Sequence, residues 1–121
     1  MPATTNKGGT CYQDALLAVL FGPPGCVLVQ GYPRLTSKDE HFGKKYGHAW
    51  VEVEVCGAWF VIDHHIPTSL IPKALYYAVG RIDPAECHTY TRREAKALER
   101  KFRHAGPWHE EPADAIFSED L

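Results

Sequence analysis

Residues 47–63 (GHAWVEVEVCGAWFVID) constrain the fold more than any other part of the chain, because they have the pattern of a β-hairpin. Polar and apolar side chains alternate up to Val55, as in a strand with one buried face. Cys56 and Gly57 can form a two-residue turn, after which residues 58–63 return as a second strand. This pattern predicts two antiparallel strands whose apolar pairs share one face: Val55 with Ala58, Val53 with Phe60 and Val51 with Ile62.

The predicted register also brings two chemically capable side chains together on the opposite face. It places Trp50 across from Asp63 and His48 across from His65, so that His48 and Asp63 are diagonal neighbours. There the carboxylate of Asp63 could accept a hydrogen bond from the imidazole of His48. Simpler interpretations remain open: His48 as a strand-end histidine with no special role, and Asp63 as a residue that caps the following turn.

Two capping-box spacings mark the starts of predicted helices. Thr10 with Gln13 predicts a helix over Cys11–Phe21, and Thr91 with Glu94 predicts a last helix that ends at about residue 104. The other predicted elements are a strand over residues 26–32, a charged surface loop over residues 33–46 and a short helix over residues 72–79.

Length and composition indicate one small domain. The chain has 121 residues, of which 45% are apolar and 23% charged, so residues 1–106 can bury a core of their own. Residues 107–121 contain five acidic residues and no Lys or Arg, which predicts a loosely ordered tail. The net charge of -2 gives no general attraction to nucleic acid or to acidic membranes.

Targeting signals are not evident in the sequence. No apolar run reaches the roughly 18 residues of a membrane span. Residues 1–10 lack the apolar core of a secretory signal. We therefore expect a cytoplasmic protein whose four cysteines are reduced and structural, apart from the candidate nucleophile.

Cys11 is the candidate nucleophile, because it falls in the first turn of the first predicted helix. The N–H groups and the dipole of a helix N-terminus favour the negative thiolate, which is the reactive form of cysteine. Gly8 and Gly9 would let the backbone of a substrate approach closely. The alternative is that Cys11 is only a small buried residue, as free cysteines often are.

A metal site is a weaker alternative. Adjacent strand residues point to opposite faces, so His64 and His65 cannot easily serve the same site, and we expect one of them to border the cleft. Cys87 and His88 could add ligands, but the four residues lack the spacing of known zinc sites. We therefore predict no metal and no cofactor.

Three blocks of the sequence resemble the transglutaminase-like superfamily, whose core is papain-like. GHAWVEVEVCGAWFVID is similar to the His-to-Asp block, TCYQDALLAVL to the block that carries the nucleophilic Cys, and CVLVQGY to the strand between them. The match covers residues 8–63. The resemblance implies an α+β fold in which the nucleophile helix packs on a small antiparallel sheet, followed by C-terminal helices. It also implies Cys11 as nucleophile, His48 as base and Asp63 as the acid that orients it.

Other resemblances are narrower. KGGTCYQDA is similar to the Gly-Gly-x-Cys block of arylamine N-acetyltransferases, lasso-peptide leader peptidases have a similarly compact Cys-His-Asp unit, and the whole chain resembles short uncharacterised phage and prophage proteins. Papain-like enzymes place an amide side chain before the Cys, which implies Asn6 as an oxyanion donor beside the backbone N–H of Cys11. Candidates for the cleft wall are Gly9, Tyr12, Trp50 and His65. The segment after Asp63 does not match, so no substrate is implied.

The expected activity is cysteine-dependent acyl transfer or hydrolysis at an amide bond of a protein or peptide substrate, through a thioester. This includes peptidase, amidase and deamidase chemistry. The alternative is a catalytically inactive fold, phage-encoded or not, that acts as a protein-binding or accessory factor. Basic residues near one stripe of the last helix are interpreted as a solvated face rather than a nucleic-acid surface: Arg92, Lys96, Arg100 and Arg103.

Overall fold

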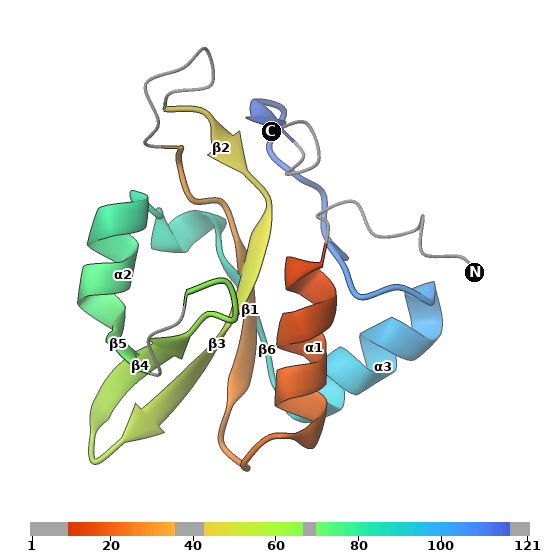
Figure 1. The fold of residues 1–121 in the computed structure, drawn as a ribbon. Helices are drawn as coiled ribbons and strands as arrows, with labels where there is room; N and C mark the ends of the chain where they lie inside the picture. Colours follow the sequence, from red (N-terminus) through yellow and green to blue (C-terminus); the bar gives the residue numbers. More distant parts are fainter. Residues whose placement is uncertain (1–9, 36–42, 67–69, 117–121) are drawn as a thin grey trace.

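A five-stranded antiparallel sheet in the order β5-β4-β3-β1-β6 forms the centre of the protein (Figure 1). The computed structural model describes residues 10–35, 43–66 and 70–116. Within these residues α1 and α3 cover one face of the sheet and α2 covers the other. The mixed α+β class predicted from the sequence is thereby confirmed. The elements are α1 Cys11–Phe21, β1 Val27–Gly31, β2 Lys45–Tyr46, β3 His48–Val55, β4 Ala58–Ile62, β5 Ile71–Pro72, α2 Lys73–Gly80, the 3-10 turn Pro84–Glu86, β6 His88–Tyr90, α3 Arg92–Phe102 and β7 Ala115–Ile116.

The hairpin of β3 and β4 has the predicted register. Cys56 and Gly57 adopt φ angles of 52° and 85°, so both lie in the left-handed region that a tight two-residue hairpin turn requires. The three predicted cross-strand pairs all form: Val55 with Ala58, Val53 with Phe60 and Val51 with Ile62. The first half of β3 is buried, whereas its end and the turn are exposed to solvent.

The first helix has the predicted bounds, but its predicted capping box is wrong. Thr10 has a nearly helical backbone (φ -85°, ψ -13°), and its side chain makes no capping hydrogen bond. An N-cap hydroxyl reaches the third helical N–H only from an extended backbone. The capping box of α3 is confirmed: Thr91 accepts from the N–H of Glu94, and the carboxylate of Glu94 accepts from the N–H of Thr91.

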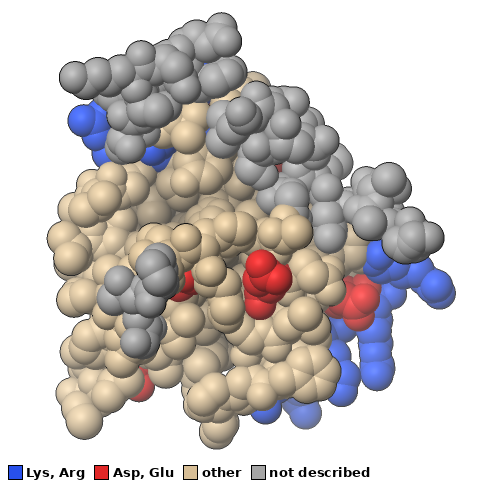
Figure 2. Space-filling model, viewed as in Figure 1, with Lys and Arg blue, Asp and Glu red and all other residues tan. Residues whose placement is uncertain are grey.

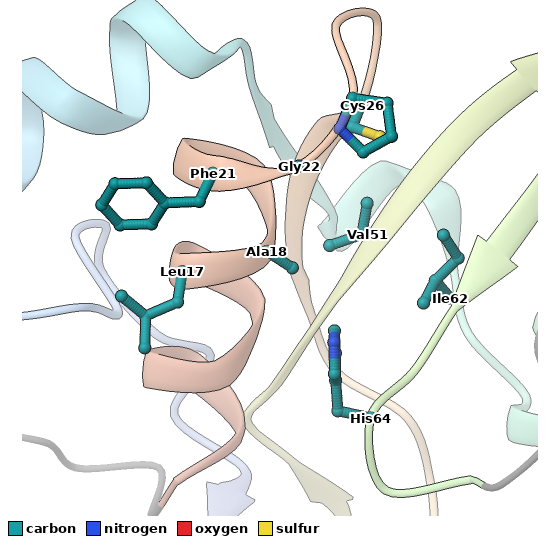
Figure 3. A pocket seen from close by; sticks show the side chains of 9 residues that line it. Leu17, Ala18, Phe21, Gly22, Cys26, Val51, Ile62 and His64 are labelled. Carbon is teal, nitrogen blue, oxygen red and sulfur yellow. The ribbon is translucent and has the colours of Figure 1, made fainter.

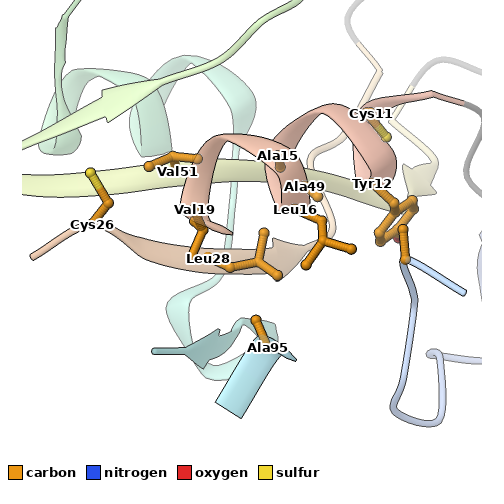
Figure 4. Close-up of a cluster of buried hydrophobic side chains, with 11 residues drawn as sticks. Cys11, Tyr12, Ala15, Leu16, Val19, Cys26, Leu28, Ala49, Val51 and Ala95 are labelled. Atoms are coloured by element: carbon orange, nitrogen blue, oxygen red, sulfur yellow. The ribbon is translucent and has the colours of Figure 1, made fainter. Parts of the chain in front are cut away.

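Two apolar cores lie on the two faces of the sheet. Alternate residues of β3 point to opposite sides, so Ala49 and Val51 contact α1 while Trp50 contacts α2. Figure 4 shows the first core, in which side chains of α1 and Leu28 of β1 meet above α3. Figure 2 shows that Lys and Arg gather over α3, whereas few charged side chains lie over α1 and the hairpin.

Residues 107–116 of the acidic segment contact the rest of the fold. β7 pairs in parallel with β2, a strand within the segment predicted as a loop. The hydroxyl of Tyr32 lies 2.7 Å from Nε2 of His109, and Nε1 of Trp108 donates to the carbonyl of His104. These contacts come from Trp108 and His109, which stand just before the first acidic residues of the segment. Among the described residues, no helix is long and apolar enough to cross a membrane.

Candidate active site

The N-terminus of α1 and the start of β3 meet beside the end of β4. Cys11 is the first residue of α1 and is only 4% exposed. His48 is the first residue of β3, and its side chain forms a hydrogen bond with Cys11. The thiol therefore lies at a helix N-terminus and against an imidazole, the placement that a cysteine nucleophile and its base require.

His48 is held on its other side by Asp63. Nε2 of His48 lies 2.8 Å from Oδ2 of Asp63, and both side chains are buried, with exposures of 8% and 3%. Because the carboxylate occupies Nε2, Nδ1 is the ring nitrogen left to exchange a proton with Cys11. The diagonal contact follows from the hairpin register, which sets the two residues on one face of the sheet.

The pKa values of His48 and Asp63 are both strongly shifted. Burial by itself lowers the pKa of His48, but hydrogen bonds with Asp63 and Cys11 outweigh it and raise this pKa from 6.5 to about 9. Burial by itself raises the pKa of Asp63, but His48 and further donors lower it to about 2. At neutral pH the site therefore holds an imidazolium against a carboxylate.

Asp63 has two further partners. The hydroxyl of Tyr76 on α2 donates to Oδ2 at 2.5 Å, and the N–H of His65 donates to Oδ1 at 2.9 Å. Tyr76 was not among the site residues predicted from the sequence. Its role could have been inferred from one general rule, that a tyrosine on the buried side of a helix needs a hydrogen-bond partner for its hydroxyl.

Glu52 is a second buried carboxylate on the same face of β3. It accepts from Nε1 of Trp50 at 2.9 Å and from the hydroxyl of Tyr77 at 2.5 Å. Nζ of Lys73 lies 3.0 Å from its other oxygen. Two neighbouring tyrosines of α2 thus bind two carboxylates of the hairpin, Tyr77 on Glu52 and Tyr76 on Asp63.

Of the predicted cleft residues, His65 lies at the rim. Its ring centroid is 5.7 Å from that of His48, and its Nε2 lies 3.9 Å from Oδ2 of Asp14 on α1. Trp50 and Tyr12 are buried instead, Trp50 beneath His48 and Tyr12 in the first core. Both are large aromatic rings, which gain most by burial between a helix and the sheet. Asn6 and Gly9 lie outside the described residues.

The residues of the alternative metal site are spread across the sheet. His65 follows β4, whereas Cys87 and His88 lie at β6, with β3 and β1 between the two strands. No group of three potential ligands comes together within the part of the chain that the structure describes. Cys56 lies exposed at the hairpin turn, and no disulfide joins the four cysteines.

Comparisons with known proteins do not extend these observations. No protein-family model, no curated protein and no solved structure matches the chain. The likeness to transglutaminase-like proteins therefore rests on the three sequence blocks and remains a prediction.

Proposed function

We propose that this chain is a cysteine-dependent enzyme on a papain-like, transglutaminase-like core, which hydrolyses or transfers the acyl group of an amide or peptide bond. The observation that carries the proposal is the position of His48, which is hydrogen-bonded to Cys11 on one side and to Asp63 on the other. A nucleophile, a base and a group that orients the base are the minimum that this chemistry needs.

The proposed reaction uses His48 first as base and then as acid. In the proposed resting site it has already taken the proton of Cys11, in keeping with its raised pKa, and the sulfur then attacks the carbonyl carbon of the substrate. His48 then gives this proton to the leaving nitrogen as the C–N bond breaks, which leaves a thioester on Cys11. Attack by water gives an acid, and attack by an amine gives a new amide. Asp63 keeps the ring oriented, and the proposed donor to the developing oxyanion is the backbone N–H of Cys11 at the start of α1.

The non-catalytic alternative is favoured by one observation. Cys11 and His48 are both largely buried, with exposures of 4% and 8%. A thiol in that position could be a packed core residue of a protein that only binds a partner. The two functions differ in the reactivity that they require of Cys11, so reactivity is what the experiment measures.

The test is alkylation of the intact protein by iodoacetamide at pH 7, followed by peptide mapping of each cysteine. Cys56 is the internal reference, because it is exposed and lies at the hairpin turn. We expect Cys11 to react at least ten-fold faster than Cys56 despite its burial, and to lose this advantage in His48→Ala. If Cys11 reacts more slowly than Cys56, and His48→Ala does not change the rate at Cys11, the proposed enzyme is wrong and the non-catalytic binding protein replaces it.

A further inference from the structure

A groove of about 310 Å³ lies between the second half of α1 and the hairpin. Figure 3 shows Ala18 of α1 facing Ile62 and His64 across it, with Val51 behind. The residues that carry the argument are Ala18, Gly22, Cys26, Val51, Ile62 and His64. His64 is the one that can carry a positive charge among these six, and the surrounding face holds few charged side chains (Figure 2).

The groove and the candidate active site are linked through α1, which forms one wall of the groove and carries Cys11 at its N-terminus. On α1, Cys11, Asp14 and Ala18 follow one another at spacings of three and four residues, so they lie on one stripe of the helix. Ile62 and His64 line the groove, whereas Asp63 between them points toward Tyr76 of α2 on the other side of the sheet. Asp14 of the α1 stripe lies 3.9 Å from His65, which follows His64 in the chain.

The length of the groove sets which part of a substrate it could hold. A rise of about 1.5 Å per residue puts Ala18 about 10 Å from Cys11 along the helix axis. An extended peptide covers about 3.3–3.6 Å per residue, so the same distance corresponds to about three residues. A volume near the lower end of ligand pockets, which begin at about 300 Å³, suits one large side chain.

We infer that this groove binds a bulky apolar side chain of a peptide substrate, about three residues from the attacked carbonyl on its acyl side. The inference rests on the proposed function, because it names the substrate of that site. An acidic side chain is disfavoured, since the lining is otherwise apolar and His64, its one candidate partner among these six residues, is exposed to solvent. We assign the groove to the acyl half of the substrate because this half stays bound to Cys11 through the thioester. Its contacts therefore act both when the thioester forms and when it is resolved.

The test uses two tetrapeptidyl chloromethyl ketones that differ only at the residue three positions from the reactive carbon, phenylalanine in one and aspartate in the other. Alkylation of Cys11 is followed by mass spectrometry. Each rate is divided by the iodoacetamide rate of the same variant, so that changes in the thiol itself cancel. We expect the phenylalanine compound to react at least ten-fold faster with the wild-type protein.

Two variants place opposite charges in the groove. Ala18→Lys should lower the phenylalanine-to-aspartate ratio to about one or below, and His64→Glu, at an exposed position, should slow the aspartate compound further. Val79→Lys is the matched control, because Val79 is an exposed apolar residue of α2, on the opposite face of the sheet. Thermal melting of each variant establishes that it is folded.

The outcomes separate this inference from the proposed function. If Cys11 reacts rapidly with iodoacetamide but the ratio is near one in the wild type and in both groove variants, the groove inference is overturned and the proposed function stands. If Val79→Lys changes the ratio as much as Ala18→Lys does, the effect is not due to the groove and the inference fails. If Cys11 is unreactive toward iodoacetamide as well, the proposed function fails and the inference fails with it.

Discussion

Asp63 is the residue on which the geometry of the site depends most. Its carboxylate accepts from the imidazole of His48, the hydroxyl of Tyr76 and the backbone N–H of His65. The contact with His48 could be predicted, because both residues belong to one hairpin of alternating pattern. The contact with Tyr76 could not, because no local pattern fixes how α2 lies against the sheet.

A comparison of Tyr76→Phe with Tyr77→Phe should distinguish an effect on the position of His48 from an effect on the stability of the fold. Each change removes one hydrogen bond to a buried carboxylate, Asp63 or Glu52, and should lower the free energy of unfolding by about 1.5–3 kcal/mol. Only Tyr76→Phe should slow iodoacetamide labelling of Cys11, by several-fold, because Asp63 then holds His48 less firmly. Equal labelling rates in the two variants would show that Tyr76 acts on stability alone.

Gly47 is expected to be intolerant of any side chain. A Cβ atom there would lie 2.5 Å from the hydroxyl of Tyr12 and 3.0 Å from an oxygen of Glu111. Gly47→Ala should therefore displace the start of β3, lower the free energy of unfolding by about 1–3 kcal/mol and slow the labelling of Cys11.

The control for Gly47→Ala is the double variant with Tyr12→Phe. Removing the hydroxyl opens space for the new methyl group, and this buried hydroxyl has no hydrogen-bond partner among the described residues. Tyr12→Phe alone should be neutral or slightly stabilising, and the pair should recover most of the lost stability in urea unfolding. If the double variant is as unstable as Gly47→Ala, the hydroxyl is not the cause.

At the scale of elements, the helices and strands could be predicted from the sequence more readily than the contacts that hold their ends. The bounds of α1 follow from its apolar residues and from Gly22 and the prolines behind it. Two carbonyls at its C-terminal end accept from α3, since Arg92 donates to Val19 at 2.9 Å and to the C-cap residue Gly22 at 2.5 Å. These partners are 73 and 70 positions apart in the chain, so no local rule could have identified them.

Arg92→Met should loosen the attachment of α1 to α3. The methionine keeps part of the apolar stem but removes both hydrogen bonds, and the exposed one contributes little. We expect a loss of about 1–2 kcal/mol in urea unfolding. Arg93→Met, at the next and equally exposed position, should change stability by less than about 0.5 kcal/mol. Equal losses in both variants would contradict a special role for Arg92.

For the whole molecule, the α+β class was predictable and the sheet order was only partly so. Hairpins are local, and the pairing of β3 with β4 follows from the turn. The pairing of β1 with β6 and of β2 with β7 joins distant segments and leaves no periodic signal in the sequence. The acidic composition of residues 107–116 gives no indication of the pairing with β2, because that pairing depends on a distant segment of the chain.

The stability of the molecule should depend on the protonation of His48. Its pKa rises from 6.5 to about 9 on folding, so the imidazolium contributes fully below pH 6.5 and its contribution is lost as the pH rises through about 9. The full contribution is on the order of 3 kcal/mol. Urea unfolding of the wild type and of His48→Gln at several values between pH 6 and pH 10 measures it. We expect the difference in stability to shrink by about this amount, and a constant difference would exclude a raised pKa.

The hairpin turn at Cys56 and Gly57 also bears on the order in which the site is assembled. His48 and Asp63 are only 15 residues apart in the chain, and closing so short a loop costs little chain entropy. Hairpins of this kind form within about 1–10 microseconds. The thiol arrives from a separate helix, and its docking depends on slower contacts between distant segments. The imidazole and the carboxylate can therefore meet first, so that a chain still in the course of folding carries no activated nucleophile.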